Sequence, residues 1–291
     1  MRRLLVLLGL VAAFAVPTPA TAAPAPPVAE AATPPVIHVS APAGAKRAAL
    51  AVTAKIHHYN ICNAYDGDPC NQQQAANAEN ILRFLAVADG AWFISINEIC
   101  QDTFARLASQ LGSDGTMVFS KREEPDCGGR GYGNAILHPG GVRQDGTAWY
   151  FPTQVPGRDC TDPGTECRTG LCLKLGTFAG PMAMCTAHLG AGTDDDTRDQ
   201  SAEYAFIARS WVEQGRRLAL AGDFNLTPGQ LHPVWDGMVD LVLGNTHDTR
   251  DGLDKQIDYI FIEPVGTWTG HVPFCEAQAS DHCFTNGDWH L

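Results

Sequence analysis

The chain has 291 residues, of which 45% are hydrophobic and 18% are charged. This balance is typical of a globular protein and excludes an intrinsically disordered one. Lys and Arg number 20 against 32 Asp and Glu, and the formal net charge is −12. That charge excludes a generally basic nucleic-acid coat protein, although it is compatible with an enzyme that has a local basic patch.

Residues 1–23 have the pattern of a secretory signal peptide. Arg2 and Arg3 give a positive start, residues 4–16 form an apolar core, and residues 20–22 supply a small-residue cleavage site. The apolar core is shorter than the about 20 residues that a membrane-spanning helix needs. We therefore expect removal of this segment and a secreted protein without stable membrane insertion, in preference to an uncleaved anchor helix.

Residues 24–46 are rich in proline and alanine. Proline fixes φ and removes a backbone donor, so this composition predicts an extended and poorly ordered linker. The sequence that follows has no internal repeat and no second linker. We therefore expect one folded domain over residues 47–291, present as a monomer.

The ten cysteines predict disulfides, because an exported protein enters an oxidising compartment. Their spacings contain no CxxC pair and do not fit a zinc cluster. The first and last pairs below are the best supported, whereas the cysteines of the middle group crowd one loop and could exchange partners. Pairing of nearest neighbours gives Cys62–Cys70, Cys100–Cys127, Cys160–Cys167, Cys172–Cys185 and Cys275–Cys283.

The apolar patterns after the linker alternate between strand and helix, which predicts an α/β or α+β fold with helix-covered sheets. The helices are predicted from three apolar stripes, which we expect to face the core. These stripes are Ile81, Leu85 and Ala88; Phe104, Leu107 and Leu111; and Tyr204, Ile207 and Trp211 within residues 197–214. Strands are expected at 49–61, 91–96, 133–137, 182–187, 217–221 and 257–262.

Polar residues recur where these apolar runs begin or end, which is where open sheets place their functional sites. Carboxylate and carboxamide oxygens favour Mg²⁺ or Mn²⁺ over zinc. Each site alone is explained equally well as a turn or a cap, but seven in series favour a common function. The seven are His-Tyr-Asn (58–60), Ile-Asn-Glu (96–98), Tyr-Gly-Asn (132–134), Cys-Thr-Ala-His-Leu (185–189), Gly-Asp-Phe-Asn (222–225), Gln-Ile-Asp-Tyr (256–259) and Ser-Asp-His (280–282).

In this order the motifs resemble the endonuclease/exonuclease/phosphatase superfamily, which includes DNase I-like nucleases and bacterial sphingomyelinases. The resemblance extends over essentially the whole chain after the linker. It implies a four-layer α/β/β/α sandwich, here stapled by disulfides, with the active site at one end of two packed sheets. It also implies a divalent cofactor, Mg²⁺ or Mn²⁺.

The resemblance also implies a role for each motif residue. Glu98 is implied as the principal metal ligand, with Asn60 and Asp281 completing the first or second shell. Asp223 would orient or deprotonate the attacking water, and Asn225 would donate a hydrogen bond to the phosphate. His282 would lie against the phosphate, and Asp258 would hold the other ring nitrogen of His282. His188 would serve as a general acid or as a phosphate ligand.

Two further residues are candidates near the substrate. Arg130 could clamp a phosphate, because a guanidinium matches phosphate geometry, or it could be an exposed loop residue. Asn134 is expected to hold the loops around the metal or to lie close to the site. We interpret the other histidines as structural, with His58 the least certain because it is two residues from Asn60.

The leading hypothesis is a secreted, Mg²⁺-dependent phosphodiester hydrolase of the DNase I kind, with nucleic acid as its substrate. The alternative is a sphingomyelinase-like phospholipase C, which acts on a lipid headgroup and needs an exposed apolar loop. Residues 149–151 and Trp268 are candidates for that loop. A catalytically inactive binding or toxin-like module is a third hypothesis, which the intact set of catalytic residues disfavours.

Overall fold

The computed structural model describes the chain from Thr33 onward, with several gaps. The expected signal peptide (residues 1–23) and Cys70 lie outside the described residues, as does most of segment 24–46. The described residues are 33–41, 53–64, 72–139, 142–154, 157–177, 180–191, 194–247, 255–276 and 278–291.

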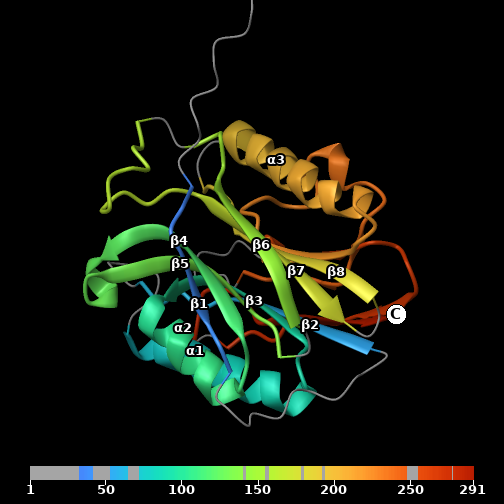
Figure 1. Ribbon diagram of the computed structural model, residues 1–291, viewed down its shortest axis with the longest axis horizontal. Coiled ribbons are helices and arrows are strands. Elements are labelled where there is room, and N and C mark those ends of the chain that lie inside the picture. Colours follow the sequence, from blue (N-terminus) through green and yellow to red (C-terminus); the bar gives the residue numbers. More distant parts are fainter. Residues whose placement is uncertain are drawn as a thin grey trace, which may run out of the picture. The chain divides into compact units, whose positions relative to one another are not determined.

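Two β-sheets pack face to face, and helices cover their outer faces (Figure 1). Helices α1 (Gln72–Asp89) and α2 (Gln101–Leu111) lie against one sheet. Helix α3 (Asp194–Glu213) lies against the other sheet. This arrangement is the α/β/β/α sandwich that the sequence motifs imply.

The sheet beneath α1 and α2 has seven strands in the order β1–β4–β5–β3–β2–β13–β12. Strands β2 and β3 are parallel, so both end at the same edge. The strands are β1 (Val36–Val39), β2 (Thr53–Asn60), β3 (Phe93–Cys100), β4 (Gly115–Glu124), β5 (Arg130–Leu137), β12 (Thr267–Gly270) and β13 (Thr285–His290).

The sheet beneath α3 has six strands in the order β10–β11–β9–β8–β7–β6. Here β8 and β9 are parallel and end together. Strand β11 runs antiparallel to β9, so the start of β11 lies at the same edge. The strands are β6 (Val142–Tyr150), β7 (Thr169–Thr177), β8 (Gly180–His188), β9 (Arg217–Asp223), β10 (Val239–Asp240) and β11 (Asp258–Ile262).

Apolar side chains fill the space between the two sheets. Ile56 and Phe93 from one sheet pack with Leu173 and Met184 from the other, and all four are fully buried. Complete burial of such a side chain stabilises the fold by about 1.5–3 kcal/mol. The core therefore holds the two sheets together beneath the edge where the polar motifs lie.

The helix stripes face the core, with one difference in α1. Phe104, Leu107, Tyr204 and Trp211 are buried, as their spacing predicts. In α1 the closest contacts with the sheet come from four other residues, and Ala88 of the predicted stripe is exposed. The buried face of this helix combines small alanines with Leu82, and Ile81 and Leu85 of the predicted stripe are half-buried against the same core. The buried apolar residues are Ala75, Ala78, Leu82 and Ala86.

The folded unit begins earlier than the predicted domain start at residue 47. Residues 36–39 lie in the expected linker but form β1, which pairs with β4 at the sheet edge. The sequence Val-Ile-His-Val supplies the β-branched side chains that favour a strand. The proline content of the surrounding segment therefore obscured a short edge strand.

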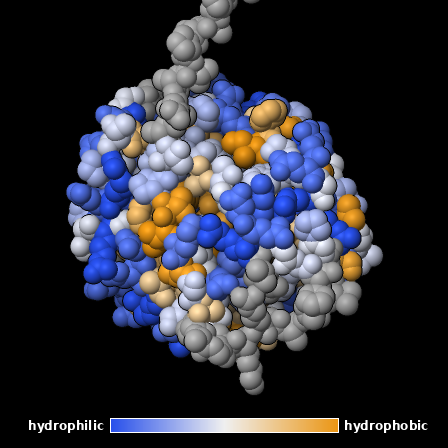
Figure 2. All heavy atoms as spheres, in the orientation of Figure 1, coloured by the Kyte–Doolittle hydropathy of each residue, from blue (hydrophilic) through white to orange (hydrophobic). Residues whose placement is uncertain are grey.

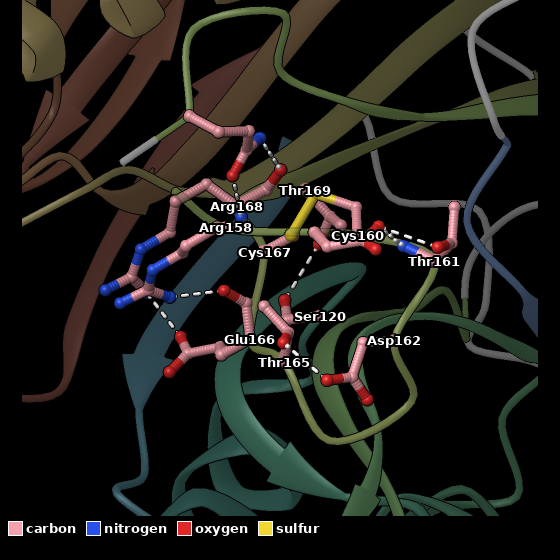
Figure 3. Close-up of a disulfide and its surroundings, with 12 residues drawn as sticks. Ser120, Arg158, Cys160, Thr161, Asp162, Thr165, Glu166, Cys167, Arg168 and Thr169 are labelled. Atoms are coloured by element: carbon pink, nitrogen blue, oxygen red, sulfur yellow. Dashed lines mark hydrogen bonds and ion pairs between the residues drawn. A yellow bond between two sulfur atoms is a disulfide. The ribbon is translucent and has the colours of Figure 1, made fainter. Parts of the chain in front are cut away.

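Four of the five predicted disulfides are present. They join Cys100 to Cys127, Cys160 to Cys167, Cys172 to Cys185 and Cys275 to Cys283. The fifth predicted pair includes Cys70, which lies outside the described residues. Figure 3 shows the loop that Cys160–Cys167 closes, with Glu166 inside the loop and Arg158 and Arg168 just outside it on the same side.

The surface is mainly hydrophilic on the face shown in Figure 2, where hydrophobic side chains gather in separate patches. Large exposed hydrophobic side chains include Phe84 and Phe206, one on α1 and one on α3. Among the described residues, every helix is too short or too polar to cross a membrane.

Candidate active site

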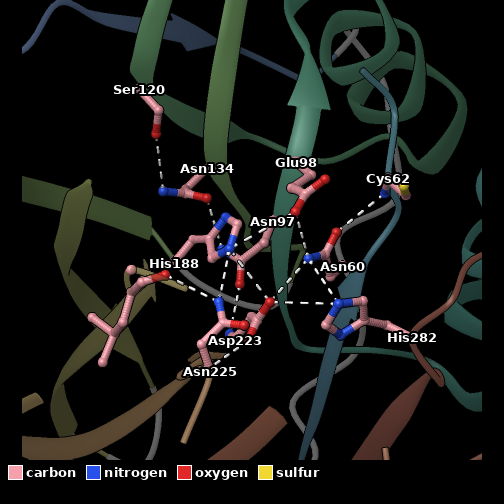
Figure 4. Close-up of polar contacts among 12 residues, drawn as sticks. Asn60, Cys62, Asn97, Glu98, Ser120, Asn134, His188, Asp223, Asn225 and His282 are labelled. Atoms are coloured by element: carbon pink, nitrogen blue, oxygen red, sulfur yellow. Dashed lines mark hydrogen bonds and ion pairs between the residues drawn. The ribbon is translucent and has the colours of Figure 1, made fainter. Parts of the chain in front are cut away.

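The ends of β2, β3, β8 and β9 meet at one edge of the two sheets, together with the start of β11. These positions bring Asn60, Glu98, His188 and Asp223 together. Figure 4 shows their side chains pointing toward one another, with His282 beside them. The structure therefore places motif residues that are far apart in the sequence in a single cluster.

Asn60 links the two carboxylates of this cluster. Its Nδ2 donates to Glu98 Oε1 at 3.0 Å and to Asp223 Oδ2 at 3.2 Å. Its Oδ1 accepts the backbone N–H of Cys62 at 3.1 Å. Asn60 therefore points its nitrogen at the two carboxylates and orients them, while its oxygen is held by the backbone of Cys62.

Two cluster residues occupy the left-handed backbone region, which non-glycine residues rarely adopt. Glu98 has φ of 57° and Asn225 has φ of 52°. Glu98 also lies where the register between β3 and β5 shifts. An irregularity of this kind re-aims a side chain at a strand end, and such strain concentrates at functional sites. The local backbone is thus shaped to turn Glu98 toward Asn60.

Asp223 stands at the centre of the cluster. Its Oδ1 accepts the N–H of Asn225 at 2.9 Å, and its Oδ2 lies 3.4 Å from His188 Nε2 and 3.5 Å from His282 Nε2. The preceding Gly222 allows this position, because a Cβ there would lie 2.1 Å from the carbonyl oxygen of Ala187. The Gly-Asp-Phe-Asn motif therefore combines close strand packing with a turn that directs both polar side chains into the site.

His282 and Asp258 form a buried pair. His282 Nδ1 lies 2.8 Å from Asp258 Oδ2, and Asp258 is completely buried. Burial alone would raise the pKa of Asp258, but His282 and His58 lower that pKa below its ordinary value. Burial opposes a charge on His282, yet Asp258 and Asp223 together raise the pKa of His282 well above its ordinary value. At neutral pH His282 therefore carries a positive charge.

His188 has the opposite environment. Arg168 Nη1 lies 3.0 Å from its Nδ1 and 3.2 Å from its Nε2, and Asn225 Nδ2 lies 3.3 Å from Nε2. Burial, together with the Arg168 charge, lowers the pKa of His188 well below its ordinary value. His188 is therefore neutral at neutral pH. The site thus holds one charged and one neutral histidine on either side of Asp223.

The donor set fits a hard divalent cation. Glu98, His188 and Asp223 each offer an atom within 4.8 Å of the others. Burial raises the pKa of Glu98 to about 7, although Asn60 and His282 lower it. A cation at this point would balance the charge of Glu98 and add to the positive charge that His282 already places beside Asp223. Asp281 lies to one side, with its Oδ2 3.5 Å from His247 Nε2.

The predicted phosphate clamp at Arg130 lies on the surface instead. Arg130 Nη1 is paired with Asp102 Oδ1 at 2.6 Å, and both side chains are more than half exposed. The guanidinium in the cluster belongs to Arg168, whose Nη1 also pairs with Glu166 Oε1 at 2.8 Å. An arginine directly after a cysteine and before a strand was the available sequence signal for Arg168.

Asn134 supports the site from behind. Its Nδ2 donates to Thr169 Oγ1 at 3.1 Å, and its Oδ1 accepts from Asn97 Nδ2 at 2.9 Å. Asn97 Oδ1 in turn accepts the backbone N–H of Asp223 at 2.8 Å. Asn97 was not among the predicted site residues, although it directly precedes Glu98. Tyr132 was also missed; it is buried, and burial together with the nearby Glu98 charge raises the pKa of its hydroxyl well above the ordinary value.

The architecture is the endonuclease/exonuclease/phosphatase fold, as the sequence motifs predict. An endonuclease/exonuclease/phosphatase from Beutenbergia cavernae matches with 20% identity, 82% coverage of this chain, 72% of that chain and a TM-score of 0.60. Truncated TDP2 from Caenorhabditis elegans matches with 16% identity, 82% and 98% coverage and a TM-score of 0.61.

A mannosyl-6-phosphatase from Bacteroides thetaiotaomicron matches with 13% identity, 80% coverage of this chain, 98% of that chain and a TM-score of 0.56. Comparisons of the sequence with models of protein families and with curated proteins found no match. At these identities the structural likeness establishes the fold, so the chemistry is argued from the cluster itself.

Proposed function

We propose that this protein is a secreted, divalent-metal-dependent phosphodiester hydrolase, and that its substrate is nucleic acid, as for a DNase I-like endonuclease. The observation that carries the proposal is the convergence of Glu98, Asp223, His188, Asn225 and His282 at one sheet edge. A carboxylate-rich centre flanked by cationic and amide donors suits a phosphate group and an attacking water.

Glu98 would be the main ligand of Mg²⁺ or Mn²⁺, which would withdraw charge from a phosphate oxygen when bound. Asp223 lies next to this position and accepts hydrogen bonds only, so it would orient the attacking water and take its proton. Asn60 would hold both carboxylates in place through its shared Nδ2. Proton transfer to a positioned base of this kind contributes about 10²–10⁴-fold.

The phosphate would be bound by donors from both sides of Asp223. His282, held as a cation by Asp258, would donate from Nε2 to a phosphate oxygen or to the leaving oxygen. Asn225 and Arg168 would donate from the side of neutral His188. Hydrogen bonds to such a charged group are each worth about 1.5–3 kcal/mol.

The aromatic residues bear on the choice between nucleic acid and lipid. Phe151 is 1% exposed and Trp149 packs against the same core, so residues 149–151 do not form a surface loop. Trp268 is 41% exposed on β12 and is the remaining aromatic candidate for a membrane contact. Because Phe151 is buried and Trp149 and Tyr150 are half-buried, residues 149–151 give little support to the phospholipase, and we favour the nuclease. Four disulfides support the proposal of secretion.

The test is a substrate panel with the mature protein: plasmid DNA, RNA and sphingomyelin vesicles, each with Mg²⁺, Mn²⁺ or EDTA. We expect cleavage of nucleic acid that EDTA abolishes and added metal restores. Asp223→Asn is expected to lose this activity with a melting temperature close to that of the wild type. Turnover of sphingomyelin with intact plasmid would favour the phospholipase instead, and no turnover of any phosphoester would contradict the proposal.

A further inference from the structure

His58 lies next to the catalytic residues, although no motif assigns it a function. It is on β2 and is completely buried. Its Nε2 is 3.1 Å from Oδ1 of Asp258, while Oδ2 of the same carboxylate is 2.8 Å from His282 Nδ1. Asp258 is therefore held on both sides, by one imidazole that belongs to the catalytic cluster and one that lies behind it.

For a neutral His58 imidazole, the hydrogen bonds around it have a single consistent direction. Ionised Asp258 can only accept, so both imidazoles must donate to it. With its hydrogen on Nε2, His58 has a free acceptor at Nδ1, which lies 3.0 Å from Ser95 Oγ. Ser95 must then donate to His58 and accept from Thr186, whose Oγ1 is 2.7 Å away.

The same chain ends at the backbone N–H of Asp223, the second catalytic acidic residue. Thr186 Oγ1 accepts from Asn97 Nδ2 at 3.4 Å, and Asn97 Oδ1 accepts the backbone N–H of Asp223. A buried chain in which each described member has a partner fixes its members in one arrangement, whereas a broken one leaves a buried polar group unpaired. Asp258 and Asp223 are thus connected through a continuous set of side chains.

This chain crosses the interface between the two sheets four times, and two of the crossings are the contacts of Asn97 with Thr186 and with Asp223. His58 and Ser95 belong to the seven-stranded sheet, whereas Asp258 and Thr186 belong to the six-stranded sheet. The contacts of His58 with Asp258 and of Ser95 with Thr186 are therefore both contacts between sheets. They lie directly behind the edge where the catalytic residues from the two sheets must meet.

We propose that His58 is a positioning residue for the reaction, acting through Asp258 on His282. By holding Oδ1, it keeps Oδ2 directed at His282 Nδ1 and so keeps Nε2 of His282 directed at the phosphate. Without His58, Oδ1 of Asp258 is a buried and unpaired oxygen, and the carboxylate is free to rotate. The kinetic part of this inference rests on the proposed phosphodiesterase activity, whereas the structural part does not.

The experiment compares His58→Phe and His58→Gln with His57→Phe in the full mature chain. His57 is a matched control, because it is equally buried on β2 and neither ring nitrogen has a hydrogen-bond partner among the described residues. The first measurement is the NMR signal of the His282 Nδ1 proton, with its exchange rate. The second is the pH profile of kcat and of kcat/KM on the phosphodiester that the substrate panel identifies.

We expect His58→Phe to speed exchange of the His282 Nδ1 proton and to lower kcat about 10- to 100-fold with little change in KM. His58→Gln, which can still donate to Asp258, should recover part of both losses, and His57→Phe should change neither. A folded His58→Phe protein with a wild-type His282 signal would overturn the inference. If His58→Phe does not fold, the same result in a folded His58→Leu protein, which also cannot donate to Asp258, would overturn it. If the wild type cleaves no phosphoester but His58→Phe still loses the His282 signal, the proposed function is refuted and the positioning role is kept.

Discussion

The two histidines of the site have different surroundings, although both lie within 3.5 Å of the same oxygen of Asp223. His282 is held by Asp258, whose own contacts reach across both sheets. His188 is held by Arg168, which follows a disulfide-closed loop. The carboxylate raises the pKa of one imidazole and burial with the guanidinium lowers that of the other. Identical side chains thus acquire different charges from their neighbours alone.

This difference suggests a division of labour between the two sides. The His282 side is built from strands and buried hydrogen bonds, which favour a fixed catalytic donor. On the other side, His188 ends β8 and its partner Arg168 directly follows a disulfide-closed loop, and loops are where substrate contacts of enzymes commonly lie. Variants that remove one partner at a time are therefore expected to affect kcat on the first side and KM on the second.

The largest effect is expected for Asp258→Asn. The change removes the charge that stabilises the His282 imidazolium, so the pKa of His282 falls. Activity that requires protonated His282 is lost as the pH rises through that pKa, so the alkaline limb of the pH–rate profile should move to lower pH. At neutral pH we expect kcat to fall about 10³–10⁴-fold, by analogy with other carboxylate–histidine pairs.

Asp240→Asn is the control for this variant. Asp240 is also a carboxylate of the six-stranded sheet, half-buried on the edge strand β10, and burial raises its pKa to about 6. Its side chain accepts from Gln256 Nε2 and from the backbone N–H of Val242. Its substitution should leave the pH–rate profile in place. If Asp258→Asn cleaves substrate at the wild-type rate and with an unshifted profile, the role given to His282 is wrong.

A smaller effect is expected for Arg168→Gln, which removes the guanidinium on the His188 side. Loss of one charged hydrogen bond to phosphate should lower kcat/KM about 10- to 100-fold, mainly through KM. The pKa of His188 should rise at the same time, because a neighbouring positive charge is gone. The measurement is kcat and KM of Arg168→Gln, with Arg130→Gln as the control. Equal effects of both substitutions would contradict a specific role of Arg168.

The smallest effect is expected for the pH dependence of the free energy of unfolding. It concerns His57, which lies on the same strand as His58. Burial lowers the pKa of His57 to about 3, whereas in the unfolded chain it titrates near its ordinary value of 6.5. As the pH falls below 6.5 the unfolded state gains a proton that the native state does not bind, so stability decreases. At pH 5 this amounts to about 2 kcal/mol.

His57→Phe should remove that dependence and retain packing against Phe284, which His57 contacts edge to face. The measurement is urea unfolding of both proteins at pH 7.5 and pH 5. We expect the wild type to lose more unfolding free energy than the variant between these pH values. Parallel losses in the two proteins would show that His57 becomes protonated in the native state or that other groups dominate.

Patterns within single segments were sufficient to predict an α/β or α+β fold and to mark the motif residues, whereas the four layers were implied by the resemblance of the ordered motifs to the superfamily. For example, Gly-Asp-Phe-Asn after an apolar run marks Asp223 and Asn225 as residues at a strand end without reference to other segments. Arg168 and His58 could not be ranked in this way. Their partners lie on other elements, so their function depends on packing that the local pattern does not contain. The same reason explains why β1 was assigned to a linker and why the surface residue Arg130 was a candidate phosphate clamp.

The placement of His282 has a consequence for biosynthesis. It lies between Ser280, which bonds to the backbone of Asn60, and β13, which pairs with β2. A growing polypeptide that has not yet made these contacts lacks an assembled centre, however much of the remainder has folded. Under the proposed function, the ribosome-bound or unfolded precursor is inert, and the cell that makes the enzyme is shielded from it until this late strand docks.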